Sequence, residues 1–173
     1  MGTRAIFNGI GISSKKIPGH FYFNIIILYI IEAISYYISG SIINVKKIGR
    51  KGSLYLYYII IIITFINLAF VYLNIPIELT LNLLARFCTC GTEVILYTYT
   101  LEVYPTLVRS AAFGVNITFG NGGAIIAPMI LEYLPKWAFY MIFCCICILN
   151  SFLLIFLPET VGKPMVETIE ELN

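Results

Sequence analysis

Five long apolar stretches, separated by short polar segments, constrain the fold of this 173-residue chain more than any other feature. The hydrocarbon core of a bilayer is about 30 Å thick, and a helix of roughly 20 apolar residues can cross it. Stretches of about this length cover residues 21–43, 54–73, 79–101, 111–131 and 137–157. The sequence therefore predicts an all-α polytopic membrane protein with about five transmembrane helices.

The composition agrees with burial in lipid. Apolar residues make up 60% of the chain and charged residues 12%, against about 45–50% and about 25% in soluble domains. The formal net charge of +2 is too small to indicate binding of nucleic acid. The lipid bilayer is therefore the expected partner, and no nucleic acid is expected.

Candidate catalytic and metal-binding residues are scarce in the sequence. The five cysteines lie inside apolar stretches, and the single histidine, His20, is not close to any of them in sequence. Packing therefore explains the cysteines better than a zinc site does. Motifs typical of serine hydrolases, nucleotide-binding loops and zinc peptidases are absent. We expect no enzyme activity, no metal and no cofactor.

The polar segments predict how the chain crosses the membrane. Residues 45–53 carry four basic side chains, and basic loops are enriched on the cytoplasmic side. This orientation makes residues 1–19 an extracellular segment, residues 20–157 the transmembrane region and residues 158–173 a cytoplasmic tail. An outside N-terminus without a secretory leader favours a missing upstream part.

Charged side chains inside the apolar stretches mark a candidate functional region. A charge at bilayer depth costs at least about 2.5–3.5 kcal/mol, so such groups usually face a partner or a water-filled cavity. In the stretch 79–101, polar residues recur every three or four positions and share one helix face. They are Arg86, Cys90, Glu93, Tyr97 and Thr100. The stripe predicts a cavity lining, and separate pairing of each charge with a neighbouring helix is the alternative.

A weaker stripe of the same spacing lies in the stretch 21–43 and contains Glu32. Charge balance predicts that Glu32 meets Arg86 across a helix interface. The stretch 111–131 is rich in glycine and contains Pro128. Small residues allow close helix packing, and glycine with proline allows bending, so close packing and a moving, substrate-lining helix remain equal alternatives there.

Four motifs at the predicted membrane boundaries carry a family resemblance. They are Gly49-Arg50-Lys51, residues 99–114 (YTLEVYPTLVRSAAFG), residues 122–128 (GGAIIAP) and residues 157–172 (LPETVGKPMVETIEEL). In this order the sequence resembles the organic cation and anion transporters, the solute carrier 22-like family of the major facilitator superfamily, over nearly the whole chain. The resemblance implies that the five stretches are helices 8–12 of a twelve-helix fold. It also implies that residues 6–14 are the tail of helix 7.

The resemblance further implies transport of small organic solutes, such as organic ions, by alternating access between two six-helix halves. The residues expected to line the substrate pathway are Glu32, Arg86, Glu93, Tyr97 and Asn121. The residues expected to form a charge network at the inner gate are Arg50, Glu102, Arg109 and Glu159. Loop solubility and positive-inside topology are the alternative explanation of the second group.

Two of these positions depart from the family pattern. The position aligned with Asn121 is often Arg in anion transporters and Asp in cation transporters, whereas asparagine supplies no counter-ion. The charge of the substrate therefore does not carry over. Glu93 stands where the family more usually has an uncharged residue, which makes it a candidate for cation or proton coupling.

The number of helices bears on function, because a carrier of this class needs both halves to enclose its site. We therefore expect a partial transporter in the plasma membrane. Its expected partners are a small organic solute and either a missing N-terminal half or a full-length relative. A non-transporting membrane partner or regulatory fragment of a full-length transporter is the alternative function.

Overall fold

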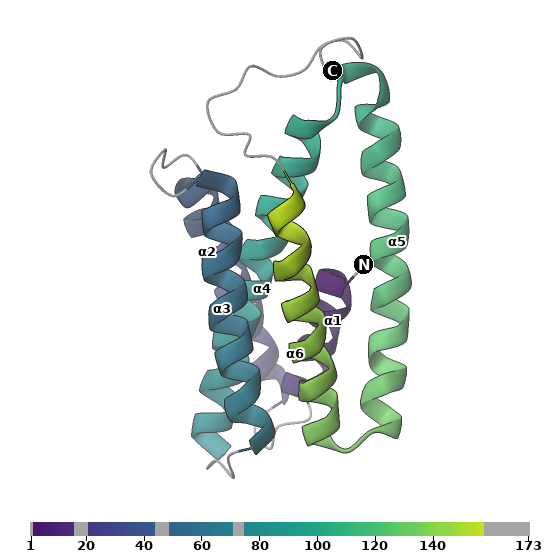
Figure 1. Ribbon diagram of the computed structural model, residues 1–173. Helices are drawn as coiled ribbons and strands as arrows, with labels where there is room; N and C mark the ends of the chain where they lie inside the picture. Colours follow the sequence, from purple (N-terminus) through teal and green to yellow (C-terminus); the bar gives the residue numbers. More distant parts are fainter. Residues whose placement is uncertain (1, 16–20, 44–48, 71–74, 158–173) are drawn as a thin grey trace.

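The computed structural model describes residues 2–15, 21–43, 49–70 and 75–157, which form a bundle of helices without strands. The elements are α1 (Gly2–Lys15), α2 (Phe21–Ile43), α3 (Gly49–Phe70), α4 (Ile75–Val103), α5 (Thr106–Tyr133), α6 (Lys136–Leu153) and the short 3-10 helix η1 (Leu154–Phe156). Helices α2 to α6 run up and down the long axis of the bundle, whereas α1 begins near its mid-height (Figure 1). The predicted all-α class is confirmed.

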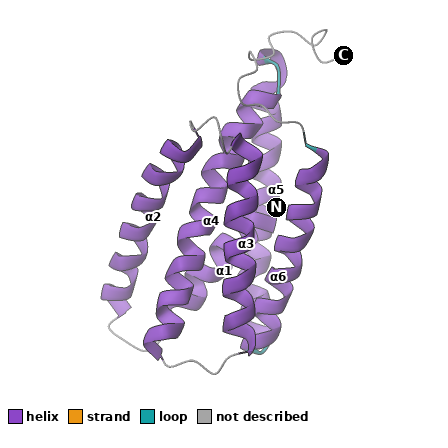
Figure 2. Cartoon of the chain, turned by 60° about the vertical axis from the view of Figure 1, so that its left-hand side comes forward, coloured by secondary structure: helices purple, strands orange, loops and turns teal. Residues whose placement is uncertain are grey.

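Helix packing places α4 at the centre of the bundle. It contacts α2 on one side and α3 on another, while α3 also packs along α6. Helix α1 fits between α4 and α5 and makes its most extensive contact with α5. Figure 2 shows α2 at one edge of the bundle and α6 at the other, with α3 and α4 between them.

Four described helices are long and apolar enough to cross a membrane: Tyr22–Ile43, Gly49–Phe70, Pro76–Val103 and Lys136–Phe156. They overlap four of the five predicted spans, although α3 begins at Gly49 and not at residue 54, and residues 71–73 of that span lie outside the described residues. Helix α5 contains the fifth predicted span but is not one of these four. That span, and the division into outer segment, membrane region and tail, remain predictions. The tail over 158–173 lies outside the described residues.

Helix α1 extends the helix tail expected over residues 6–14 back to Gly2. Its residues Ile6 and Ile10 are buried in the same core as Phe65 of α3 and Phe143 of α6. Aromatic rings pack α3 against α6, with ring centroids 6.3 Å apart for Phe65 and Phe143. The first helix is therefore an integral part of the bundle.

Small residues bring α2, α3 and α4 close together. Ser35 Oγ of α2 donates a hydrogen bond to the Phe87 carbonyl of α4 at 2.6 Å, and Ser39 Oγ is 2.9 Å from Tyr57 Oη of α3. Gly91 of α4 lies against this second pair, since a Cβ there would be 2.5 Å from Ser39 Oγ. Glycine at position 91 thus permits α4 to approach Ser39 of α2 and Tyr57 of α3 closely.

Large apolar side chains are exposed on the outer helices. On α2 they include Tyr22 and Tyr37, which are 79% and 81% exposed, and on α5 they include Phe119 and Ile125. Soluble monomers rarely leave such extensive apolar surface in water. The exposed faces therefore agree with a membrane location.

Candidate functional site

An ion pair joins α4 to α2 inside the bundle. Arg86 Nη2 donates a hydrogen bond to Glu32 Oε2 at 2.9 Å, and the two side chains are only 7% and 16% exposed. Tyr36, one turn further along α2, donates its hydroxyl proton to the other carboxylate oxygen of Glu32 at 2.7 Å. The predicted contact between Glu32 and Arg86 is confirmed.

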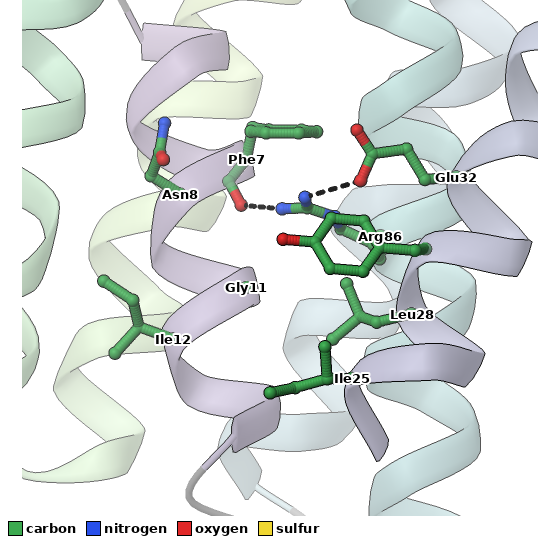
Figure 3. A pocket seen from close by; sticks show the side chains of 9 residues that line it. Phe7, Asn8, Gly11, Ile12, Ile25, Leu28, Glu32 and Arg86 are labelled. Atoms are coloured by element: carbon green, nitrogen blue, oxygen red, sulfur yellow. Dashed lines mark hydrogen bonds and ion pairs between the residues drawn. The ribbon is translucent and has the colours of Figure 1, made fainter. Parts of the chain in front are cut away.

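Arg86 also reaches α1. Its Nη1 donates a hydrogen bond to the Phe7 carbonyl at 2.5 Å, and its guanidinium carbon lies 3.5 Å from the centre of the Phe7 ring. Gly11 leaves room for this group, because a Cβ there would be 3.0 Å from Arg86 Nη1. Figure 3 shows the guanidinium between the Phe7 carbonyl and the Glu32 carboxylate. One side chain thus connects α1, α2 and α4.

A cavity of about 250 Å³ opens beside this ion pair. Its walls come from three helices and are mostly apolar, with one acid, one base, one amide and one phenol: Phe7, Asn8, Gly11, Ile12, Ile25, Leu28, Tyr29, Glu32 and Arg86. Apolar walls with a few convergent polar groups are typical of sites for small organic molecules. We refer to this space as the main cavity.

A second charged cluster joins α1 to α4 further along the polar stripe. Arg4 Nη1 lies 3.5 Å from Glu93 Oε2, and the same nitrogen donates a hydrogen bond to Tyr97 Oη. A smaller cavity of about 50 Å³ adjoins the cluster, and Asn116 and Gly120 of α5 contribute to its wall. The predicted stripe therefore faces two separate spaces, and its charges also pair with neighbouring helices.

Sequence reasoning missed Arg4, which it placed in the outer segment. A signal for it exists in the charge balance of the apolar stretches, where Glu32 and Glu93 are two acids and Arg86 is one base. Buried charges in a membrane protein need partners, so the second acid required a base from outside those stretches. Arg4 supplies that base because α1 packs against α4.

Asn121 lies apart from the other predicted pathway residues. Its side chain is exposed on α5, and it lines neither of the two cavities described above. The structure therefore brings Glu32 together with Arg86, and Glu93 together with Tyr97, but does not bring Asn121 to either pair. The part of Asn121 in a pathway remains a prediction.

Two of the predicted gate residues, Arg50 and Glu102, pair at the end of the bundle where α3 begins. Arg50 Nη2 is 2.5 Å from Glu102 Oε1 of α4, and Arg50 Nη1 donates a hydrogen bond to the Ile43 carbonyl of α2 at 3.4 Å. Gly49 has a φ of 71°, a left-handed conformation that favours glycine. The start of α3 is thus tied to the ends of α2 and α4.

Of the other two predicted gate residues, the structure describes Arg109. Arg109 donates its Nε proton to the Tyr104 carbonyl at 3.2 Å, within the turn between α4 and α5, and Glu159 lies outside the described residues. Lys51, which was not predicted, donates hydrogen bonds to the carbonyls of Leu157 at 2.5 Å and Ile155 at 3.3 Å. The pairing of Arg50 with Glu102 is therefore established, while a gating role remains a prediction.

Comparison with known proteins identifies the family. The family model described as sugar (and other) transporter matches residues 3–172. The chain belongs to this family. It is accordingly a multi-pass membrane protein, and the resemblance to solute carrier 22 proteins is confirmed by its curated relatives.

Three relatives from this comparison are longer than this chain. Solute carrier family 22 member 15 of Xenopus tropicalis is 30% identical over 178 residues, which cover 97% of this chain and 33% of the relative. Solute carrier family 22 member 16 of Xenopus laevis is 28% identical, covering 92% and 28%. Organic cation/carnitine transporter 2 of Rattus norvegicus is 25% identical, covering 95% and 30%. The chain spans about a third of the length of these relatives.

We expect Glu102→Gln to loosen the end of this transporter-family bundle at which Arg50 lies. Loss of the ion pair is worth about 1 kcal/mol, which corresponds to a roughly fivefold faster thiol-labelling rate at a cysteine introduced in place of buried Ser53. The measurement uses membranes and a Cys145→Ser background, because Cys145 is exposed.

Glu132→Gln is the matched control, since Glu132 is exposed near the other end of α5. Its labelling rate should equal that of the parent chain. Equal rates for Glu102→Gln and the parent would leave topology and solubility as the explanation of the boundary charges.

Proposed function

We propose that this chain forms part of a carrier that moves small organic solutes across the plasma membrane by alternating access. The observation that carries the proposal is the main cavity between α1, α2 and α4, with the Arg86–Glu32 pair in its wall. A buried ion pair adjoining an open, mostly apolar cavity is typical of a pathway for a solute that has both apolar and charged parts.

The chemistry of the main cavity supports a charged or zwitterionic organic solute. A solute carboxylate would replace Glu32 on the guanidinium of Arg86, and a solute ammonium would replace Arg86 on the carboxylate of Glu32. Phe7 already presents its ring to a cation, and aromatic rings attract organic cations in the same way. The name of the rat relative, organic cation/carnitine transporter 2, agrees with this class of solute.

The position of α1 supports alternating access. Arg86 holds α1 through the Phe7 carbonyl, and Glu93 holds it through Arg4. A solute that displaced either partner would loosen α1 from α4. In carriers built from two halves, such exchanges at a central site change the side to which the site opens.

The test is an uptake assay with a panel of organic cations, anions and zwitterions. The chain is expressed alone and also joined to the preceding part of the Xenopus tropicalis relative, and cell-surface amounts are measured for each. We expect the joined protein to take up one solute class saturably, with at least a tenfold loss on Glu32→Gln. Glu132→Gln serves as the control and should retain uptake.

The result that would contradict the proposal is background uptake of every solute by a joined protein that reaches the surface in normal amounts. If the chain alone does not transport but co-purifies with a full-length relative and changes its uptake, the alternative of a regulatory partner is favoured.

A further inference from the structure

Glu93 is a buried carboxylate, and one of its two oxygens lacks a hydrogen-bond partner among the described residues. Its side chain is only 8% exposed, and Oε1 has no hydrogen-bond partner among the described residues. Oε2 lies 3.5 Å from Arg4 Nη1, whereas charge-assisted hydrogen bonds of this kind are usually about 2.7–2.9 Å long. Burial of an ionised carboxylate is costly unless it is paired and fully hydrogen-bonded.

Among the described side chains, the charged and titratable groups that face Glu93 include one cation in direct contact with it, Arg4. They are Arg4 from α1, Glu32 and Tyr36 from α2, and Arg86, Cys90 and Tyr97 from α4 itself. Arg86 is engaged by Glu32 and by the Phe7 carbonyl. Arg4 in turn is shared between Glu93 and Tyr97. From α5 the smaller cavity receives the neutral residues Asn116 and Gly120.

We propose that Glu93 is a proton-binding site, and that the carrier proposed above takes up and releases one proton there during its cycle. The coupling part of this inference rests on the proposed function, whereas proton binding does not. In the binding step a proton from water forms a bond with the free oxygen Oε1, and the side chain changes from charge −1 to neutral. No other bond is broken, and the reverse step returns the proton to water.

The smaller cavity brings a water-sized space to the Glu93 side chain. Its volume of about 50 Å³ exceeds the roughly 10–15 Å³ that one water molecule requires. Its lining includes the polar residues Thr3, Tyr97 and Asn116 as well as Glu93. Such a space accommodates a water molecule that can pass a proton to the carboxylate.

A proton fits this site better than a metal cation does. Sodium- and calcium-like ions need several oxygen ligands around them, and groups of three or more metal-binding side chains are absent from the described part of the chain. The guanidinium of Arg4 beside the carboxylate also repels a cation. A proton needs only one lone pair, and Oε1 provides it.

Protonation of Glu93 would change how α1 is held. The neutral acid no longer attracts Arg4, whose hydrogen bond to Tyr97 remains. One of the three polar contacts described between α1 and α4 is then weakened, while the hydrogen bond from Arg86 to the Phe7 carbonyl also remains. Proton uptake and solute binding therefore act on the same helix.

The test measures the proton itself. The purified 173-residue chain in lipid nanodiscs, with ¹³C-labelled glutamate, is titrated while the infrared carbonyl band of the protonated carboxylic acid is recorded. All nine glutamates carry the label, so we expect one titrating component of the band to be lost in Glu93→Gln and kept in Glu132→Gln. Arg4→Gln should give a larger band at the same pH, because the carboxylate loses its positive partner. An unchanged band in Glu93→Gln would overturn the proposal.

A second variant and an uptake measurement test proton binding and proton coupling separately. If Glu93→Gln does not fold, Glu93→Asp retains a carboxyl without the label, so loss of the labelled band supports the site and its persistence overturns it. In the uptake assay, transport should follow an imposed pH gradient, and Glu93→Gln should reduce that dependence at least tenfold. A titrating band without gradient-dependent uptake would overturn coupling alone, and absence of all uptake would count only against the proposed function.

Discussion

Replacing Arg86 with glutamine lowers the free energy of unfolding by about 3–5 kcal/mol, the range expected when one partner of a buried ion pair is removed. The variant leaves the Glu32 carboxylate without its cation and the Phe7 carbonyl without its donor. It also loosens α1, α2 and α4 together. We expect this to be one of the two largest effects of a single substitution in the described region.

The measurement is thermal unfolding in detergent followed by a thiol-reactive dye. A Cys145→Ser background removes the exposed thiol, so the dye reports on the buried ones: Cys88, Cys90, Cys144 and Cys147. Combining Arg86→Gln with Glu32→Gln should lose less stability than the sum of the two single changes. Additive losses would show that the two groups do not interact.

The matched control is Lys136→Gln. Lys136 pairs with Glu78 at 3.2 Å near the start of α6, but its side chain is 76% exposed. Exposed ion pairs contribute about 0–1 kcal/mol, so this variant should unfold close to the parent temperature. An effect of Arg86→Gln no larger than that of Lys136→Gln would refute the central role of the buried pair.

The second large effect is expected for Gly91→Ala. The new Cβ would lie 2.5 Å from Ser39 Oγ and 2.8 Å from two ring carbons of Tyr57. Overpacking of a tight contact costs about 1–3 kcal/mol, and here it also disturbs the hydrogen bond between Ser39 and Tyr57. The dye assay should show a correspondingly lower unfolding temperature.

Gly114→Ala is the matched control for Gly91→Ala. A Cβ at Gly114 would meet no neighbouring atom within 4 Å, and alanine is favoured over glycine in a helix by about 1 kcal/mol. That variant should therefore be neutral or more stable. Ser39→Ala should restore part of the stability lost in Gly91→Ala, because it removes the oxygen nearest to the new methyl group. Equal behaviour of the two alanine variants would contradict the close approach of α2, α3 and α4.

The candidate site was only partly predictable from the sequence. The pairing of Glu32 with Arg86 followed from charge balance, because an unpaired charge is costly at bilayer depth. The pairing of Glu93 did not follow, since its partner Arg4 lies in a segment that looked like an outer tail. The contacts of Lys51 with the carbonyls of Ile155 and Leu157 were not predicted, because backbone carbonyls carry no sequence signal.

Local properties of the chain were sufficient for the helices and for the polar face of α4. Apolar length and the three-to-four spacing of polar residues depend only on neighbours in sequence. The partners of the charges depend on which helices pack side by side, and Arg4 and Tyr97 meet across 93 positions. Only the tertiary structure could place α1 between α4 and α5, leave Asn121 exposed and create two separate cavities. The physical reason is that burial and close contact, which decide the energy of a charge, arise only when distant helices come together.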